Sequence, residues 1–404
     1  MPNRRPSRIP NRLRSLVGSA ALLCGALLAP AALAQSGGGE PILLGVSGPL
    51  TGPYAQYGAQ WRRGFDLALE QINAKGGVAG RPLGIQFEDS QSDPKQTVAI
   101  ARKFAADSRI VAELGDFTSA ASMAASPIYQ SAGLVQFGFT NSHPDFTKGG
   151  DYVWSNAPNQ ADEMPVLADY AVGALGLKRI AVLFINNDWG RTSKDLLAKA
   201  VAERGAAITG TEGYLADEKD FRSALVRVRD TNPDGIVLVS YYTDGAQITR
   251  QLREAGLTQP VVAAGSVYSP KFLELAGVAA NGVHTTTPFF PEDPRPVVQS
   301  FVKAYTAKHD TLPDAYSSRA YDAVIVLAAA IEKGGQAGSG AVERKAVREG
   351  LATLSGVPSV VYGTVQFDPQ TRRVNKPLSI RLVVKDGAFA LWDGAAGGAP
   401  RPAN

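Results

Sequence analysis

Hydroxyl-bearing side chains cluster where an apolar strand passes into a helix, in the stretch "GDFTSAASMAAS" at residues 115–126. Gly115 ends the apolar run, and Thr118, Ser119 and Ser122 stand where the helix begins. The backbone N–H groups of a first helical turn are unpaired and the helix dipole favours negative charge there, while hydroxyls add further donors. This pattern predicts a corner that holds a carboxylate, although one hydroxyl on its own more often caps the helix.

Polar and aromatic side chains follow the other predicted strands at the same edge. Thr140 ends "LVQFGFT", and Tyr54 and Tyr57 follow the first strand. The strand ends further along the chain carry Asp188, Trp189, Tyr241, Tyr242, Gly265, Ser266 and Tyr268. Small molecules bind at this edge of open α/β sheets, and an aromatic wall with a few polar groups suits a small organic solute. Core packing is about as common a role for any one of these aromatic side chains.

Motifs for catalysis or cofactor binding are missing after residue 34, where no G-x-G-x-x-G, phosphate-binding loop, H-E-x-x-H or G-x-S-x-G occurs. Residues 92–95 match S-x-x-K without its companion motifs, and Asp93 before Pro94 is typical of a helix start. The three histidines, His143, His284 and His309, lie too far apart in sequence to suggest a metal site. We therefore predict a binding protein and not an enzyme, with no metal and no cofactor.

The N-terminus has the pattern of a secretory signal peptide. Five arginines precede residue 15, a short apolar segment follows, and Ala32, Leu33 and Ala34 form a cleavage pattern, which predicts maturation after Ala34. The apolar segment is too short and too interrupted for a transmembrane anchor. Cys24 follows Leu23, where a lipoprotein signal would have a small residue, so lipid anchoring is not favoured. The sequence thus predicts export from the cytoplasm.

Composition after removal of residues 1–34 limits the number of domains and the classes of partner. The remaining 370 residues suffice for two domains with sizeable cores. The formal net charge falls from +4 to −1 because five arginines are lost, which removes the electrostatic support for a nucleic-acid partner. The single cysteine is lost as well, so packing and not disulfides must stabilise the fold.

Short apolar runs alternate with segments of helical periodicity, which predicts an α/β fold with two doubly wound parallel-sheet lobes. The pattern restarts after "NAPNQADE", a stretch rich in Pro and Thr around "GVHTTTPFFPEDPRP" interrupts the second set, and two long helical segments follow. The tail alternates like strands around "KDG". We expect lobe 1 from residues 41–157 and 287–363, lobe 2 from 158–286 and 364–393, and a flexible tail at 394–404. The chain would cross between the lobes three times, as a three-strand hinge.

Several stretches resemble the leucine/isoleucine/valine-binding family of type I periplasmic solute-binding proteins, in order and spacing through nearly the whole mature chain. They are "GVSGPLTGPYAQYGAQ", "GDFTSAASMAASPIY", "FTNSHPDFT", "DWG" and "YYTDGAQITRQLREAG". The resemblance implies a protein of the periplasm whose lobes close on a solute and deliver it to the permease subunits of an ABC importer in the inner membrane. We expect it to act as a monomer.

The resemblance also implies which side chains contact the solute. They are Tyr57, Phe117, Ser119, Thr140, Trp189 and Tyr241, with Ser119 and Thr140 helping to hold a carboxylate. We add Thr118, Gly265 and Ser266 to this set from their positions after predicted strands.

One position departs from the family pattern. In branched-chain amino acid binders an acidic residue follows the strand corresponding to "VVAAG" and pairs with the solute's ammonium, whereas this chain has Gly265 and Ser266. Burying an ammonium without a counter-charge is costly. The solute therefore either lacks an amine, as in aromatic or aliphatic carboxylates and amides, or pairs with another acid, such as Asp116, Asp188 or Asp244. A ligand-sensing module of the same fold, which reports a solute to a regulator or receptor, is the alternative function.

Overall fold

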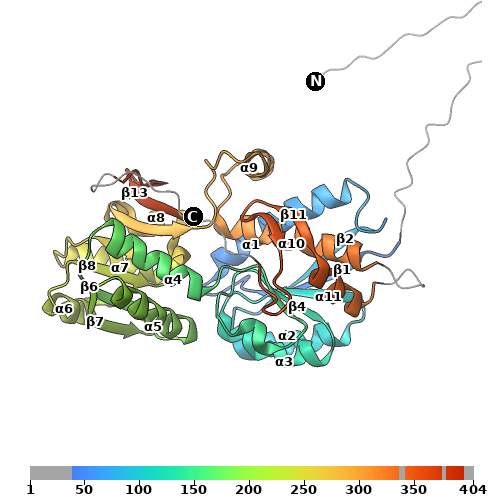
Figure 1. Ribbon diagram of the computed structural model, residues 1–404, viewed down its shortest axis with the longest axis horizontal. Coiled ribbons are helices and arrows are strands. Elements are labelled where there is room, and N and C mark those ends of the chain that lie inside the picture. The colour runs from blue at the N-terminus through green and yellow to red at the C-terminus, as the bar shows by residue number, and fades with distance from the viewer. Residues whose placement is uncertain (1–38, 336–341, 375–378, 395–404) are drawn as a thin grey trace, which may run out of the picture. The chain divides into compact units, whose positions relative to one another are not determined.

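The alternating sequence pattern forms two large β-sheets with flanking helices in the computed structural model, which describes residues 39–335, 342–374 and 379–394 (Figure 1). All of these residues fall in one compact unit of the chain, residues 37–404. The predicted signal peptide with Cys24, and residues 395–404 of the predicted tail, lie outside the described residues. Among the helices that the structure describes, none is long and apolar enough to cross a membrane.

The first sheet is parallel, with five strands in the order β2-β1-β3-β4-β5. The strands are β1 (Ile42–Gly48), β2 (Leu83–Asp89), β3 (Ile110–Gly115), β4 (Val135–Gly138) and β5 (Val153–Ser155). Ser47 of β1 pairs with Gly115 of β3, so the carboxyl ends of these strands meet at one edge. The central strands β3 and β4 are fully buried, and β1 is buried except at the partly buried Leu43, because helices cover both faces of the sheet.

Helices α2 (Pro94–Ala106) and α3 (Ser119–Ser131) cover one face of this sheet, and α1 (Ala55–Asn73), α10 (Ala315–Gly334) and α11 (Arg344–Thr353) cover the other (Figure 1). Helix α9 (Pro296–His309) packs beside α1.

The two longest helices, α1 and α10, come from opposite ends of the sequence and lie side by side. Trp61 and Phe65 of α1 are buried against the rest of lobe 1. A Cβ atom at Gly64 would lie 2.2 Å from the carbonyl oxygen of Ser317, so this glycine permits the close approach of the two helices. The side chain of Asp93 caps α2 before Pro94, which confirms the predicted helix start.

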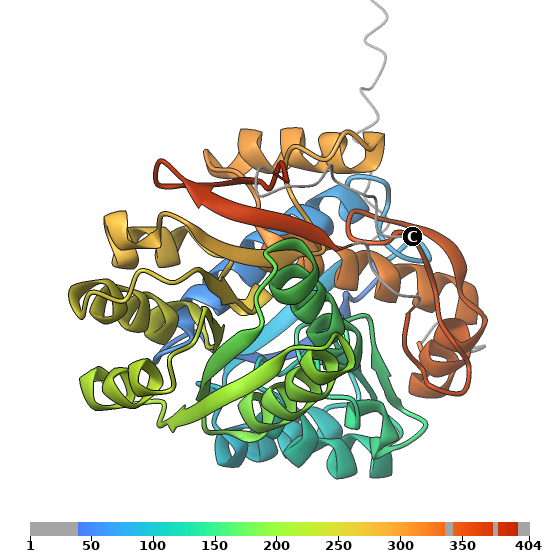
Figure 2. The ribbon, with the colours of Figure 1, turned by 60° about the vertical axis from the view of Figure 1, so that its left-hand side comes forward.

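The second sheet has seven strands in the order β14-β13-β10-β9-β8-β6-β7. Its parallel strands are β6 (Arg179–Ile185), β7 (Ala207–Tyr214), β8 (Gly235–Val239), β9 (Val261–Ala263) and β10 (Val283–Thr287). β13 (Ile380–Lys385) pairs antiparallel with β10 and with β14 (Ala388–Leu391), so the C-terminal strands complete this sheet (Figure 2). Asp386 and Gly387 turn the chain at φ values of 49° and 76°, as expected for "KDG".

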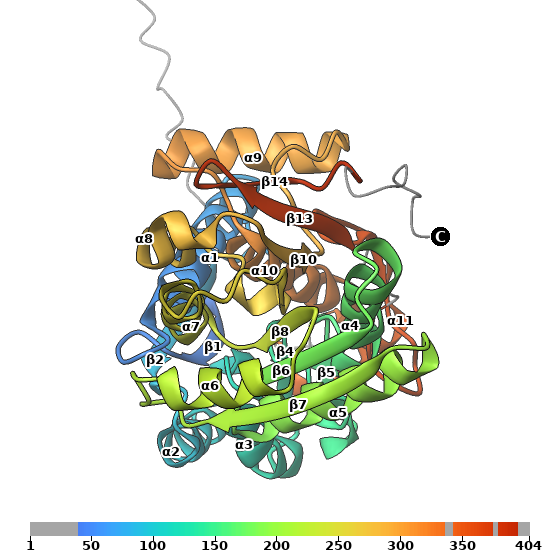
Figure 3. The same ribbon diagram turned by 90° about the vertical axis from the view of Figure 1, so that its left-hand side faces the viewer.

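Helices also pack against the strands of the second sheet (Figure 3). They are α4 (Gln160–Ala168), α5 (Asp188–Glu203), α6 (Arg222–Asp230), α7 (Tyr242–Glu254) and α8 (Pro270–Ala276). The sequence analysis places "GVHTTT" in a stretch that interrupts the second set of strands and helices. In the structure, this stretch contains β10 instead. Its three consecutive threonines are β-branched and therefore suit a strand.

We call the first sheet with its helices lobe 1 and the second lobe 2. The chain passes from lobe 1 to lobe 2 after β5 and returns after β10. It crosses again after the hairpin of β11 (Ser355–Ser359) and β12 (Gly363–Gln366), on the way to β13.

Candidate functional site

Two hydroxyl groups at the carboxyl edge of the first sheet are buried without a partner. Ser119 is 2% exposed and Thr140 is 8% exposed, and neither side-chain oxygen makes a hydrogen bond to any residue that the structure describes. Both residues line a cavity of about 40 Å³ between the lobes. Buried polar atoms are normally paired, so these two oxygens mark a place where a polar group is expected to bind.

Residues from both lobes enclose this cavity. Its walls are formed by Phe117, Ser119, Thr140, Asn141, Ser142, Glu163, Met164, Trp189, Tyr241, Ala264, Gly265, Ser266, Tyr316 and Arg319. A cavity of this size accommodates a few water molecules and not a whole amino acid. A solute therefore enters only when the lobes, or the side chains between them, move apart.

The corner between β3 and α3 is fixed by hydrogen bonds behind the cavity. The buried Asp116 carboxylate accepts hydrogen bonds from the hydroxyls of Ser90 (2.5 Å), Ser92 (2.6 Å) and Thr97 (3.0 Å). Burial raises the pKa of Asp116. Since its oxygens already have these protein donors, Asp116 positions the corner and is not available to a solute amine.

Thr118, which the sequence analysis places among the solute contacts, caps α3 and is not among the described residues that line the cavity. Its hydroxyl accepts a hydrogen bond from the Ala121 N–H (3.4 Å) and donates one to the Ser92 carbonyl (3.2 Å). The cap position directs this side chain back along its own helix. Ser119, one residue later, is the first helical residue, and its side chain faces the cavity instead.

Aromatic rings form the walls of the cavity. Tyr241, the residue before α7, stacks on Trp189 at a centroid distance of 5.0 Å, and both come from lobe 2. From lobe 1, Phe117 and Tyr316 face the same space with their centroids 6.1 Å apart. The cavity thus offers flat apolar surfaces from both lobes around two hydroxyl groups.

Tyr57, which the sequence analysis places among the solute contacts, lies behind Phe117 and is not among the described residues that line the cavity. Its ring is fully buried and stacks on Phe117 at 4.1 Å. Its hydroxyl donates to the Ser266 carbonyl (2.9 Å) and accepts from the Tyr242 N–H (3.2 Å), both in lobe 2. Tyr57 therefore supports Phe117 and connects the two lobes.

A further hydrogen bond joins the lobes at the cavity rim. The Trp189 indole N–H donates to the Ser142 hydroxyl at 3.2 Å. With the Tyr57 contacts, this bond holds the lobes together around the cavity.

The three acids proposed from the sequence as partners for an amine are all engaged elsewhere. Asp188 is exposed and forms an ion pair with Arg191. Asp244 accepts hydrogen bonds from the Tyr214 hydroxyl and the Tyr241 N–H, and burial raises its pKa to about 6. Asp116 and these two acids are not among the described residues that line the cavity.

The cavity contains two charged side chains that the sequence reasoning missed, Glu163 at the start of α4 and Arg319 in α10. Arg319 was recognisable as the one basic residue of the stretch "AYSSRAYDAVIVLAAA". Glu163 carried no comparable signal, because acidic residues are common in a first helical turn. Gly265 and Ser266, which follow β9, also line the cavity.

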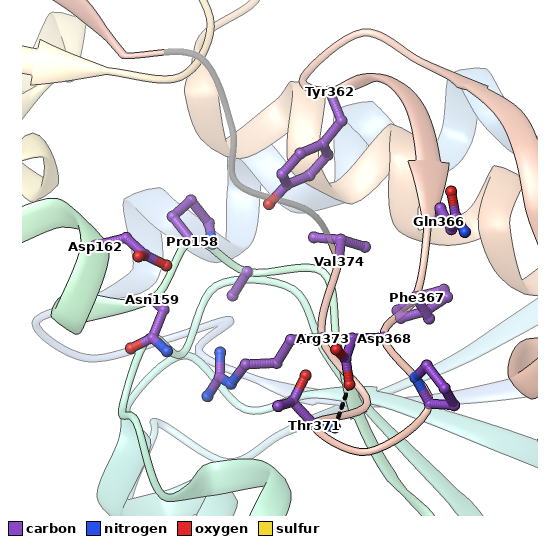
Figure 4. Close-up of a pocket in the computed structure, with 12 residues that line it drawn as sticks. Pro158, Asn159, Asp162, Tyr362, Gln366, Phe367, Asp368, Thr371, Arg373 and Val374 are labelled. Atoms are coloured by element: carbon purple, nitrogen blue, oxygen red, sulfur yellow. Dashed lines mark hydrogen bonds between the residues drawn. The ribbon is translucent and has the colours of Figure 1, made fainter. Parts of the chain in front are cut away.

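A second cavity, of about 570 Å³, lies among the segments that connect the lobes (Figure 4). Arg373 lines it, and its guanidinium extends toward Asn159. Arg373 Nη2 donates to the His143 carbonyl at 2.6 Å, while Nε and Nη1 have no hydrogen-bond partner among the described residues. Asp162 and Asp368 also line this cavity, so it carries charges of both signs. In the described part of the chain, no three His, Cys, Asp or Glu side chains gather as a metal site requires.

The sequence profile of a family described as periplasmic binding protein matches residues 41–388. The chain belongs to the periplasmic binding protein family. Members of this family are non-enzymatic solute-binding proteins of transporters. The match spans both lobes, so the architecture described above is that of the family.

Relatives in this family have known ligands. The leucine-, isoleucine-, valine-, threonine-, and alanine-binding protein of Pseudomonas aeruginosa is 30% identical over 300 residues, which cover 74% of this chain and 80% of that protein. An ABC transporter substrate-binding protein from Desulfitobacterium hafniense, solved in complex with Leu, is 27% identical with a TM-score of 0.74, covering 87% of this chain and 100% of that one.

A solute-binding protein of an ABC transporter from Rhodopseudomonas palustris, solved with 3,4-dihydroxybenzoic acid, has a TM-score of 0.77 at 21% identity. The similarity covers 86% of this chain and 95% of that one, and it is evidence for the fold alone.

Proposed function

We propose that this protein is the periplasmic substrate-binding component of an ABC importer, and that it captures a small carboxylate-bearing solute between its lobes. The observation that carries the proposal is the pair of buried, unpartnered hydroxyls of Ser119 and Thr140 at the carboxyl edge of the first sheet. A carboxylate placed there would supply the acceptors that both hydroxyls lack.

The position of Ser119 strengthens this assignment. It begins α3, where free backbone N–H groups and the helix dipole favour a negative group. The rings of Phe117, Trp189, Tyr241 and Tyr316 would bury the apolar part of the solute. Leucine, the ligand of the solved protein from Desulfitobacterium hafniense, carries a carboxylate next to an apolar side chain.

Lobe closure gives the binding step its mechanism. Lobe 1 would hold the carboxylate, and lobe 2 would then bring Trp189 and Tyr241 over it. Only contacts that the closed form adds can stabilise that form. The closed protein, exported after cleavage at Ala34 and acting as a monomer, would present the solute to the permease.

A thermal-shift panel tests the proposal. The purified protein without residues 1–34 is heated with branched-chain amino acids, short amides, dicarboxylates or aromatic acids. A true ligand at a hundred times its Kd adds about 2.7 kcal/mol to the free energy of unfolding, which raises Tm by a few degrees. The proposal predicts such a shift with at least one carboxylate and none with its methyl ester. Equal shifts with acid and ester, or chemical turnover of the solute, would overturn it.

A further inference from the structure

The cavity of Figure 4 lies where two of the chain's crossings between the lobes run next to each other. Residues 157–159 belong to the first crossing and residues 366–374 to the third. The backbone of Ser155, at the end of β5, hydrogen-bonds to that of Arg372 and Val374 at 3.0 Å and 3.3 Å, so the two segments run side by side as strands do. We call this space of about 570 Å³ the hinge cavity, and its volume is in the range of small-molecule sites.

Arg373 is a buried cation that lacks hydrogen-bond partners for most of its guanidinium. The residue is 8% exposed and lines the hinge cavity, where its guanidinium extends toward Asn159 (Figure 4). Nη2 donates to the His143 carbonyl, whereas Nε and Nη1 have no hydrogen-bond partner among the described residues. Buried polar atoms are normally paired and a guanidinium stays charged, so two of its three nitrogens are left to bind an acceptor from outside the chain.

Two carboxylates line the same cavity and restrict which acceptor fits. Asp162, in the first turn of α4, attracts Arg373 electrostatically. Asp368 is held on its own turn, where one carboxylate oxygen accepts from the Thr371 and Gln370 N–H groups at 2.7 Å and 2.8 Å, and these bonds lower its pKa. An anion that has acceptors only would meet two negative groups here, whereas an anion that also carries a hydroxyl group can donate to one of them.

We propose that the hinge cavity binds a small oxyanion that also carries hydroxyl donors, namely inorganic phosphate or the phosphate ester of a small polyol. Its oxygens accept hydrogen bonds from Arg373, and a hydroxyl donates to Asp162. A phosphate group suits this place because its several oxygens match the several N–H groups of a guanidinium. The hinge cavity shares no described lining residue with the cavity that contains Ser119 and Thr140, so the oxyanion and the solute occupy different sites.

Arg373 also connects the hinge cavity to contacts between the lobes. It holds the carbonyl of His143, which belongs to the loop after β4. From this loop, the His143 Nε2 atom lies 3.3 Å from the Thr192 hydroxyl of α5, and the Ser142 hydroxyl accepts from the Trp189 indole. An oxyanion that fixes the guanidinium also fixes this loop where the contacts to lobe 2 need it. The oxyanion therefore favours the closed lobes, and this consequence rests on the function proposed above.

Equilibrium dialysis with radiolabelled phosphate tests the site in the solute-free protein, at neutral pH and constant ionic strength. We expect saturable binding of one phosphate per chain with a Kd of about 1 mM or lower. Sulfate has no hydroxyl group at this pH and should compete about tenfold more weakly or less well still. Glycerol 3-phosphate competing better than phosphate would identify the ester as the ligand, and the reverse would identify the inorganic ion. Equal competition by sulfate and phosphate, or no saturable binding up to about 20 mM, would overturn the proposal.

The variant Arg373→Gln assigns phosphate binding to this side chain and should weaken it about tenfold or more, because hydrogen bonds to a charged group are lost. Arg372→Gln is the matched control on the preceding residue. The Arg372 guanidinium donates to the Thr147 and Val153 carbonyls and is not among the described residues that line the hinge cavity, so its loss should leave the phosphate affinity unchanged. Equal weakening by both variants would overturn the binding role of Arg373.

The variant Asp162→Asn gives a readout that a merely structural role would not move. The substitution removes the negative charge that repels an anion with acceptors only, so sulfate should bind more tightly. The preference for phosphate over sulfate should therefore fall about threefold or more. An unchanged preference would overturn the contact between Asp162 and a ligand hydroxyl.

Calorimetric titration with the best solute of the thermal-shift panel tests the effect on lobe closure. Saturating phosphate should tighten solute binding about threefold or more, and the solute should tighten phosphate binding by the same factor. Unchanged affinities would overturn the effect on closure, and displacement of phosphate by the solute would overturn the separate site. If phosphate binds but no carboxylate does, the function proposed above fails and the hinge site stands.

Discussion

The Ser119 hydroxyl should matter differently to the solute-free and the solute-bound protein. Without solute, this oxygen makes no hydrogen bond to a described residue and the cavity has room for water beside it, so Ser119→Ala breaks no hydrogen bond within the protein. The free energy of unfolding of the solute-free protein should therefore change by less than about 1 kcal/mol. In the complex the same substitution removes a hydrogen bond to a charged group, which is worth about 1.5 to 3 kcal/mol. The Kd should rise about 10- to 150-fold.

The neighbouring residue provides the control for this prediction. Thr118 caps α3 and lies outside the cavity lining, so Thr118→Ala should lower stability by about 1 kcal/mol and leave the Kd unchanged. Urea denaturation of the empty proteins and calorimetric titration with the best solute of the panel measure both quantities. The reasoning fails if Ser119→Ala destabilises the empty protein and binds the solute with unchanged affinity.

Two further predictions concern lobe closure and pH. Tyr57→Phe removes the hydroxyl that bonds to Ser266 across the lobes, so stopped-flow dissociation of the solute should accelerate about tenfold or more; an unchanged rate would contradict this. Burial raises the pKa of Glu113 to about 8, so folding should lose stability as pH rises from about 4.5 through about 8, because the folded form holds the proton longer. The urea concentration at the unfolding midpoint, measured as a function of pH, should show this loss of stability in the wild-type protein and not in Glu113→Gln. An identical pH dependence of the midpoint in both proteins would refute the assignment to Glu113.

Part of this site was predictable because it depends on neighbours in sequence. The strand-to-helix corner and its small hydroxyl residues place Ser119 at the carboxyl edge of the sheet, and Thr140 follows from the next strand in the same way. Gly265 and Ser266 follow from the end of β9. The local sequence pattern and the geometry of a parallel sheet are sufficient to predict where these residues lie.

Other features depend on packing between distant segments and could not be predicted. Thr118 and Ser119 are adjacent hydroxyl residues, and only the helix geometry decides which of them caps and which faces the cavity. Phe117 lies between Tyr57 and the cavity, and this stacking contact joins residues from different parts of the sequence. Glu163 and Arg319 line the same cavity from helices in different lobes, and a local sequence pattern cannot predict that two distant helices face one cavity. The strand β10 was missed because a proline-rich segment directly follows its threonines.

The central claim is that a carboxylate lies between the lobes on the hydroxyls of Ser119 and Thr140. A crystal structure of the protein with the solute that gives the largest thermal shift tests it most directly. The account predicts one carboxylate oxygen within about 3 Å of each hydroxyl, and contacts from Trp189 and Tyr241 on the opposite side. A carboxylate bound away from both hydroxyls, or a solute lodged in the cavity beside Arg373, would contradict it.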